Sequence, residues 1–170
     1  SFMSEKRHLG WEDVESYVKV LIDQIKESGK EYNCILGLAN GGLVPTCLIA
    51  KALGIKKVLT VSIKAYIDEI AHQVQFITSI NHKDLKGSSN ILIVDDLVDK
   101  GETLFEVEKI LGYYNYNYKL GCTFDSAVLF TKTGTGPDSK YPRVLPTYSA
   151  ETSDPDTWLI FPWELNIDDE

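Results

Sequence analysis

Three aspartates follow an apolar run in the middle of the chain. The segment reads ILIVDDLVDKGET from Ile91 to Thr103, with carboxylates at Asp95, Asp96 and Asp99. Carboxylates accept hydrogen bonds from the vicinal hydroxyls of a sugar, and they also hold hydrated Mg²⁺. The apolar run predicts a buried strand, and in an open α/β sheet ligands bind beyond the carboxyl ends of the strands. We therefore expect a ligand site at this point of the chain.

The same segment contains the elements of a phosphate site. Gly101 lets the backbone approach a ligand closely, and Thr103 adds a hydroxyl donor. A helix is expected to begin here, and its N-terminus presents unpaired N–H groups and the positive end of the helix dipole. One loop is thus able to hold a ribose 5-phosphate at both ends, with the carboxylates on the hydroxyls and the helix start on the phosphate.

Two other interpretations fit these residue types. Three acids within five residues are also typical of a solvated turn that caps a helix, which would be the ordinary role for Asp99 alone. The letters also spell D-D-x-x-D, a Mg²⁺-diphosphate motif of isoprenoid synthases, but that motif lies on a helix in an all-α protein. The apolar residues before Asp95 and the glycine at 101 favour a strand and a loop.

The rest of the chain predicts the elements that position this loop. Apolar residues at helical spacing alternate with short apolar runs. We expect helices over 14–25, 43–53 and 104–114, and strands over 34–38, 58–63, 74–80, 91–94 and 127–130. Turns or loops are expected over 40–42, 64–73 and 84–89, and a glycine- and proline-rich loop and an acidic, aromatic tail follow the last strand. This alternation predicts an α/β fold with a mostly parallel sheet flanked by helices on both faces, in a single domain over 1–170.

Composition excludes several classes of protein. The net charge of −8 and the pI near 4.9 argue against binding to nucleic acid or to anionic membranes, and we see no apolar run long enough to cross a bilayer. Three dispersed cysteines, Cys34, Cys47 and Cys122, do not form a disulfide or zinc pattern. A cytoplasmic location fits this cysteine usage best.

At this point a family resemblance becomes plain. The segment 91–103 resembles the phosphoribosyl-pyrophosphate (PRPP) signature of the type I phosphoribosyltransferases, and 36–45 resembles their pyrophosphate loop. Residues 62–66 resemble the start of their mobile catalytic loop. Residues 130–132 and 156–164 resemble the purine end of the bacterial xanthine-guanine (hypoxanthine) branch. The resemblance implies the type I phosphoribosyltransferase fold, with a small hood formed by the C-terminal segment.

The resemblance also implies an activity. A purine phosphoribosyltransferase, which is a pentosyltransferase among the glycosyltransferases, moves the 5-phosphoribosyl group of PRPP to a 6-oxopurine with the help of Mg²⁺. Its ligands are PRPP, the purine base (guanine, xanthine or hypoxanthine), the nucleoside monophosphate and pyrophosphate, and the pathway is purine salvage. The resemblance further implies a homo-oligomer, either a dimer or a tetramer.

Site residues follow from the same resemblance. Asp95 and Asp96 would contact the ribose hydroxyls and Mg²⁺, and Asp99 would face the purine N7 and help to move its proton. The ribose and phosphate of PRPP would be held by Asp95, Asp96, Asp99, Lys100, Gly101, Glu102 and Thr103. Pyrophosphate would be held by Asn40, Gly41 and Lys64, and the purine by Lys132, Trp158 and the backbone of Leu159.

Three segments depart from the family pattern. Asn40 stands where the pyrophosphate loop often carries arginine, and no arginine occurs around Ala71 and His72 in the mobile loop. In the phosphate loop, Lys100 replaces the usual threonine and Glu102 follows the glycine. The missing arginines favour an alternative function on the same fold, a non-catalytic nucleotide or PRPP sensor, whereas the intact aspartates favour the enzyme.

A run of tyrosines and asparagines over 113–118 stands outside these motifs. It is expected to be a frayed helix end and turn, or alternatively an aromatic subunit contact.

Overall fold

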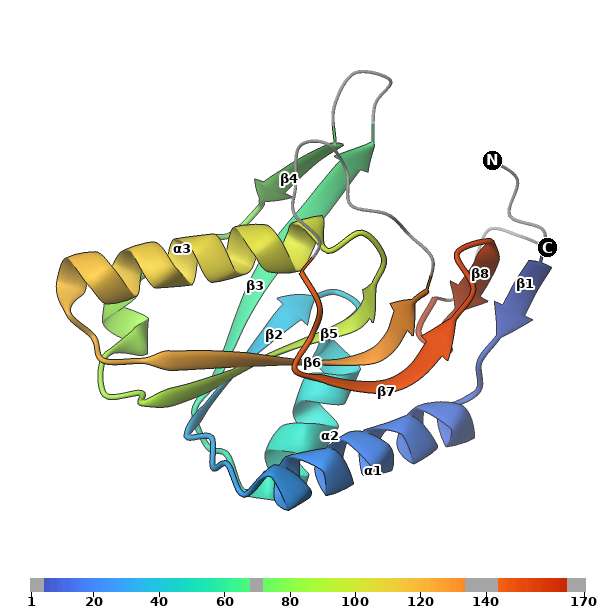
Figure 1. Ribbon diagram of the computed structural model, residues 1–170, viewed down its shortest axis with the longest axis horizontal. Helices are drawn as coiled ribbons and strands as arrows, with labels where there is room; N and C mark the ends of the chain where they lie inside the picture. The colour runs from blue at the N-terminus through green and yellow to red at the C-terminus, as the bar shows by residue number, and fades with distance from the viewer. Residues whose placement is uncertain (1–4, 68–71, 134–143, 165–170) are drawn as a thin grey trace.

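A central sheet organises the molecule (Figure 1). The computed structural model describes residues 5–67, 72–133 and 144–164, and within them one sheet has the strand order β4-β3-β2-β5-β6-β7. All neighbouring strands are parallel except the β3–β4 hairpin. The strands are β2 (Cys34–Ala39), β3 (Val58–Ile67), β4 (His72–Phe76), β5 (Asn90–Val98), β6 (Thr123–Lys132) and β7 (Tyr148–Ser153).

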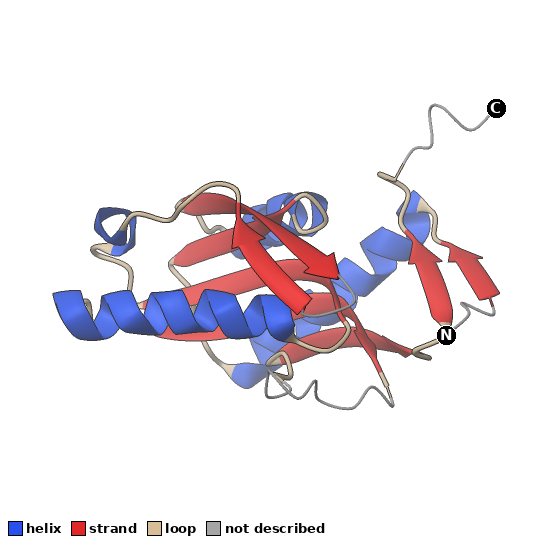
Figure 2. Cartoon of the chain, turned by 90° about the horizontal axis from the view of Figure 1, so that it is seen from above, coloured by secondary structure: helices blue, strands red, loops and turns tan. Residues whose placement is uncertain are grey.

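Within the described residues, three α-helices cover the two faces of this sheet. α1 (Trp11–Ser28) and α2 (Leu43–Leu53) pack on one face, and α3 (Glu102–Tyr118) packs on the other together with the short 3₁₀ helix η1 (His82–Leu85). Figure 2 shows the layered arrangement from above, with α3 lying along the strands. The expected mostly parallel α/β sandwich is therefore confirmed.

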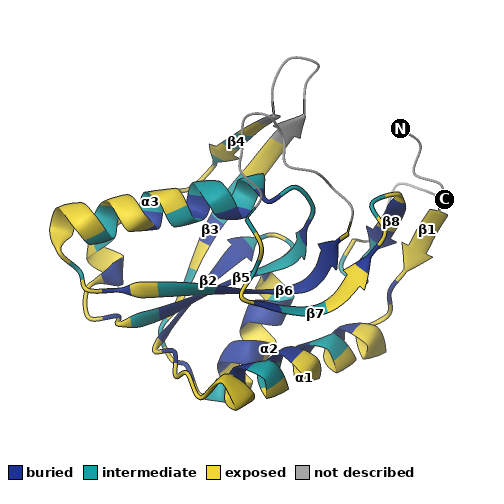
Figure 3. Cartoon of the chain, in the orientation of Figure 1, coloured by how far each residue is buried: buried dark blue, intermediate teal, exposed yellow. Residues whose placement is uncertain are grey.

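Burial explains why these segments form these elements. β2 and β5 lie in the middle of the sheet between helices, so their apolar residues are buried on both faces, and Ile91 to Val94 have no exposed surface. α1 instead buries only one stripe, Val14, Val18, Leu21 and Ile25, and exposes its other side, as Figure 3 shows. α1 ends at Gly29, whose φ of +72° is the left-handed conformation that a glycine adopts readily.

A second, small sheet lies at one end of the molecule. β8 (Thr157–Ile160) pairs in parallel with β1 (Glu5–His8) from the opposite end of the chain. The expected C-terminal hood is thus made by both ends of the chain. The pairing was not expected, because four-residue strands carry little periodicity and their partners lie about 150 residues apart in the sequence.

Several expected boundaries were wrong. The loop expected over 64–73 is largely a hairpin, since β3 continues to Ile67 and β4 begins at His72. The strand expected over 74–80 ends at Phe76, and η1 occupies part of the turn expected over 84–89. β7 was missed. The glycine- and proline-rich loop after β6 lies mostly outside the described residues, and so does the end of the acidic tail.

The strand before the aspartates is also longer than expected. β5 runs to Val98 because Asp95, Leu97 and Val98 continue the pairing with Val128, Phe130 and Thr131 of the long strand β6. Asp95 and Asp96 therefore lie on a strand and not in a loop, and only the residues from Asp99 onward leave the sheet.

The tyrosine-rich run belongs to α3. The helix continues through Tyr118, whose ring stacks on His82 of η1 with 3.6 Å between ring centroids. Packing against η1 thus keeps helical a segment that was expected to fray. In the described parts of the chain, no helix has the length and apolarity needed to span a membrane.

Candidate functional site

The site is built where the chain reverses its direction across the sheet. From β2 the chain passes through α2 to β3 on one side, whereas β5 pairs with β2 on the other side and leads through α3 to β6. The helices that follow β2 and β5 therefore lie on opposite faces. A crevice opens at such a topological switch point beyond the carboxyl ends of the strands, and ligands bind there in open α/β sheets.

The turn after β2 meets the end of β5 at this point. The Ala39–Asn40 peptide bond is cis, and Asn40 begins the turn Asn40-Gly41-Gly42. The backbone of Gly41 lies so close to the carboxylate of Asp96 that a methyl group at residue 41 would overlap it. The predicted pyrophosphate loop and the predicted ribose carboxylates are thus brought into contact.

Asp95 and Asp96 form a tight acidic pair. Both are half-buried, and Oδ1 of Asp95 accepts a hydrogen bond from the backbone N–H of Asp96 at 2.8 Å. Burial raises the pKa of Asp95 well above its usual range, and the charge of Asp96 beside it raises the pKa further. Burial also raises the pKa of Asp96. A cation or a set of hydroxyl donors at this place would favour the charged forms.

A pocket of about 170 Å³ lies at the N-terminus of α3. Its lining includes the predicted residues Asp95, Asp99, Lys100, Gly101, Glu102 and Thr103. Gly101 precedes the helix with a φ of +90°, a conformation that favours glycine, so the first N–H groups of α3 are presented beside the pocket. A larger hollow of about 490 Å³ lies beside the end of α1, near the starts of the strands, and contains none of the predicted residues.

The purine-side residues begin one strand further along the sheet. Val98 pairs with Thr131, so Asp99 and Lys132 follow neighbouring positions of β5 and β6. The Lys132 side chain is buried, 4% exposed, and its Nζ donates to the carbonyl oxygen of Pro155 at 3.1 Å. Lys132 is therefore not an ordinary surface lysine, although its part in binding a base stays a prediction.

The connection from β7 to β8 brings the aromatic residue to the same end. Pro155 lies in this connection, and Trp158 follows three residues later on β8. The Trp158 side chain is 49% exposed, which leaves ring surface for a ligand, whereas the Leu159 side chain is buried in the core. Only the backbone of Leu159 is therefore left to contact a base, and this role stays a prediction.

Lys64 lies further out than the other predicted residues. It is exposed on β3 opposite Gln75 of β4, two residues beyond Ser62, which pairs with Ala39 at the end of β2. The hairpin thus places Lys64 on the Asn40 side of the sheet edge but on a strand.

Four neighbours of the site were missed from the sequence. Ala65 lines the α3 pocket, and the backbone of Val144 lies over Gly101, where a methyl group would come within 2.7 Å of the Val144 carbonyl oxygen. The Pro155 carbonyl accepts from Lys132, and Lys6 lies over the Trp158 ring. The first three act through backbone or a methyl group, which leaves no sequence signal. Lys6 depends on the unexpected β1–β8 pairing.

The side chains at the site determine which metal ion could bind there. Among the described residues no three His, Cys, Asp or Glu side chains are grouped closely enough to hold a metal ion by themselves. Two carboxylates on β5 fit the way Mg²⁺ is usually bound together with phosphates, through one or two protein carboxylates with the other positions filled by water and phosphate oxygens. The site residues therefore fit a Mg²⁺ ion that is bound together with a phosphorylated substrate.

Comparison with protein families gives one match along nearly the whole chain. The phosphoribosyl transferase domain matches residues 10–169. A xanthine-guanine phosphoribosyltransferase from Cereibacter sphaeroides is 27% identical over 163 residues, which cover 94% of this chain and 87% of that protein.

Solved structures also match nearly the whole chain. A purine phosphoribosyltransferase from Pyrococcus horikoshii superposes with a TM-score of 0.73 and 28% identity, covering 95% of both chains. A protein from Neisseria gonorrhoeae with bound ppGpp superposes with a TM-score of 0.77 and 25% identity, covering 99% of this chain and 94% of the other.

Proposed function

Because this chain belongs to the phosphoribosyl transferase domain family, we propose that it transfers the 5-phosphoribosyl group of PRPP to guanine, xanthine or hypoxanthine. The family and the names of the similar proteins support a purine phosphoribosyltransferase, a glycosyltransferase of purine salvage. The products would be a nucleoside monophosphate and pyrophosphate. The observation that carries the proposal is the convergence of Gly41, Asp96, Asp99 and Lys132 at the carboxyl ends of β2, β5 and β6.

The phosphate of PRPP is assigned to the start of α3. The first helical N–H groups and the hydroxyl of Thr103 are donors, and the positive end of the helix dipole favours an anion. Lys100 adds a positive charge to the pocket lining, which offsets the charge of Glu102. Gly101 is needed because Val144 leaves no room for a side chain there.

The ribose is assigned to Asp95 and Asp96. Two carboxylates that are held close together are able to accept hydrogen bonds from two vicinal hydroxyls. Burial raises the pKa of both groups, and a cation bound beside them would favour their ionised forms. Mg²⁺ bound to them and to PRPP would supply charge neutralisation for the departing pyrophosphate. Asn40, Gly41 and Lys64 are the residues that would bind that pyrophosphate.

The reacting base is assigned to the space beside Asp99 and Lys132. During transfer the bond from C1 of ribose to pyrophosphate breaks and a bond from C1 to a purine nitrogen forms, through a state that resembles an oxocarbenium ion. The base loses a proton, and the Asp99 carboxylate would move it at N7 as a general base. Oriented charges around the ribose stabilise this transition state more than the ground state.

Three groups of the protein would recognise the same base. An ammonium group has three N–H donors, so Lys132 is able to bond to the Pro155 carbonyl and to O6 of an oxopurine together. Trp158 offers a flat ring for stacking. In the described part of the chain β8 pairs only with β1, and we assign the backbone of Leu159 on its other edge to the substituent at C2.

An assay of pyrophosphate release tests the proposal. The full chain is incubated with PRPP and Mg²⁺ and with guanine, xanthine, hypoxanthine or adenine in turn. We expect release with at least one of the three 6-oxopurines and little with adenine. Release with none of the four bases would overturn the proposed reaction, and a rise in melting temperature with GMP in the same preparation would then favour a nucleotide sensor.

A further inference from the structure

The N-terminal strand brings a cation to the ring that is assigned to base stacking. Lys6 on β1 and Trp158 on β8 are paired positions of the two-stranded sheet. Their side chains extend on the same side of that sheet, and Nζ of Lys6 lies 5.0 Å from the centroid of the Trp158 ring. This distance is within the range of a cation–π interaction.

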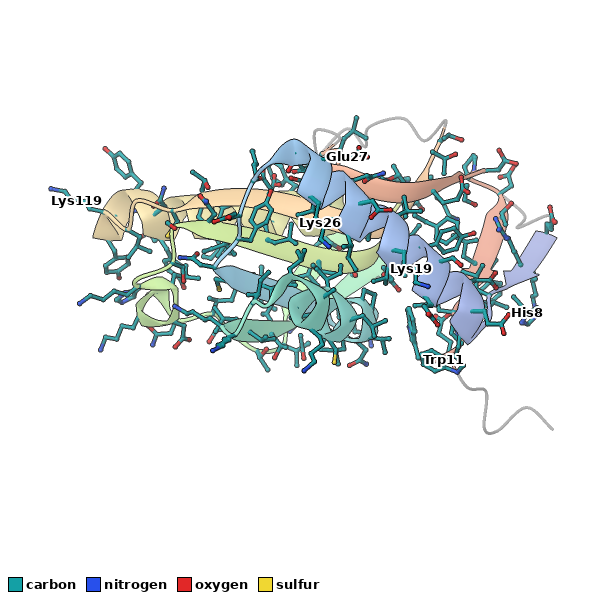
Figure 4. The ribbon with its side chains drawn as sticks, turned by 90° about the horizontal axis from the view of Figure 1, so that it is seen from below. His8, Trp11, Lys19, Lys26, Glu27 and Lys119 are labelled. Carbon is teal, nitrogen blue, oxygen red and sulfur yellow. The ribbon has the colours of Figure 1, made fainter. Side chains whose placement is uncertain are left out.

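The arrangement of the strands decides which face of the ring Lys6 covers. β8 lies between β1 and the end of the main sheet formed by β6 and β7, as Figure 1 shows. Figure 4 shows β1, with His8 at its end, on the outside of the same pair. Lys6 therefore reaches the Trp158 ring from the β1 side of the pair, and the side of β8 away from β1 faces the end of the main sheet, where Lys132 is the last residue of β6.

β1 is anchored well enough to hold this lysine in place. The neighbouring residue Arg7 points to the other side of the sheet, where its guanidinium donates to the Tyr17 hydroxyl at 3.0 Å and lies 5.6 Å from the Phe130 ring centroid. The N–H of Leu9 donates to the carbonyl oxygen of Ile160 at 2.9 Å. The strand is thus fixed to the core from one side, while its other side presents Lys6 to the indole.

We propose that Lys6 is a positioning residue for the purine base: its ammonium group covers the outer face of Trp158, holds the plane of the indole, and leaves only the inner face for stacking. The proposal deepens the proposed function and rests on the assignment of Trp158 to the base. It predicts that the N-terminal strand contributes to base affinity although none of its residues is assigned to PRPP.

The test compares steady-state kinetics of the full chain and of Lys6→Met, Lys6→Arg and Trp158→Ala. Lys6→Met removes the charge and keeps most of the side-chain length. We expect it to raise the KM for guanine about two- to fivefold, the range for one exposed cation–π contact, and to leave kcat and the KM for PRPP unchanged. Lys6→Arg retains a cation and should restore the KM. In a Trp158→Ala background, Lys6→Met should have no further effect.

Lys19→Met is the matched control. Lys19 is exposed on the outer side of α1, where it forms an ion pair with Glu15 at 3.3 Å, and the substitution changes the net charge by the same amount. It should leave every kinetic constant unchanged. If Lys19→Met raised the KM for guanine as much as Lys6→Met does, the effect would come from the net charge of the protein, and the proposal would be overturned.

Other results separate this proposal from the proposed function. If wild type turns over and Trp158→Ala raises the KM for guanine while Lys6→Met does not, the role of Lys6 is wrong and the reaction stands. A change in kcat or in the KM for PRPP as large as that for guanine would make Lys6 merely structural. If wild type does not turn over, calorimetric titration with GMP makes the same comparison, and an unchanged Kd in Lys6→Met overturns the proposal.

Discussion

The backbone of Gly41, in the turn after β2, lies against the carboxylate of Asp96 on β5. This contact joins the loop assigned to pyrophosphate to the acid assigned to ribose and Mg²⁺. It exists because β2 and β5 are neighbours in the sheet although residues 40–89 separate them in the chain. A side chain at residue 41 would act on both halves of the PRPP site at once.

Gly41→Ala should therefore impair PRPP use and keep the fold. The added methyl group displaces Asp96, so we expect the KM for PRPP to rise about tenfold or more, which corresponds to losing about 1.5–3 kcal/mol from one charge-assisted contact. Steady-state kinetics at saturating base measure it.

The matched substitution is Gly112→Ala on α3, where the methyl group meets nothing within 4 Å. It should leave the KM unchanged and stabilise the helix by about 0.5–1 kcal/mol. An unchanged KM for PRPP in a well-folded Gly41→Ala would remove this turn from the PRPP site.

Asn40→Arg should improve PRPP binding. Arginine clasps pyrophosphate with two parallel charge-assisted hydrogen bonds, whereas asparagine offers one neutral amide. We expect a high KM for PRPP in wild type and a value about tenfold lower in the variant, measured at saturating base and Mg²⁺. A low KM in wild type would mean that another cation has taken the role of the arginine, and Lys64 on β3 would be the first to replace with methionine.

Lys132→Met should change the choice of base. Lys132 is expected to donate to O6, so its loss should weaken discrimination against adenine, which carries a donor amino group at that position. Loss of the bond to the Pro155 carbonyl also leaves that oxygen to be solvated, so the melting temperature serves as a control for the fold. The ratio of kcat/KM for guanine and adenine is the measurement, and an unchanged ratio would contradict the assignment.

Asp125, which lies away from the site, should contribute to the stability of the fold in a pH-dependent way. Burial alone would raise its pKa, but hydrogen bonds from Tyr32 at 2.6 Å and Lys30 at 3.0 Å outweigh burial and hold the pKa below its usual range. A carboxylate with a lowered folded pKa stabilises the fold above the unfolded pKa of about 3.9, and this stabilisation is lost as the pH falls through the folded pKa.

Asp125→Asn is expected to lower the melting temperature at pH 7 by about 2–4 °C, the shift that about 1 kcal/mol produces in a domain of this size. Lys30 is exposed and its attraction is screened, so most of the effect comes from Tyr32. Below pH 4 the difference between wild type and variant should shrink. A difference that stays constant from pH 7 to pH 3 would contradict the pKa assignment.

The sequence was sufficient for the main sheet apart from β7, for α1, α2 and α3, and for the position of the acidic segment. These features follow from local patterns, such as the apolar run before Asp95 and the helical spacing in α1. The extension of β5 through Asp96 was missed because it depends on pairing with the distant strand β6. The β1–β8 pair, and with it the contact of Lys6 with Trp158, was missed for the same reason.

The other contacts at the site that were not predicted from the sequence are made by backbone groups. The Pro155 carbonyl and the Val144 peptide contact Lys132 and Gly101, and any residue type offers these groups. The sequence indicated only that a glycine is useful at residue 101. The close approach of the Val144 backbone, which leaves no room for a side chain there, comes from a segment 43 residues away.

Pyrophosphate release by wild type and by Asp99→Asn tests most directly whether the residues at the end of β5 perform phosphoribosyl transfer. Asparagine keeps the size of the side chain and removes the base, so kcat should fall about 10²–10⁴-fold while GMP still binds and the melting temperature is retained. Equal turnover by the two proteins would contradict the role of Asp99. No turnover by wild type with any 6-oxopurine, together with GMP binding to both proteins, would contradict the account as a whole.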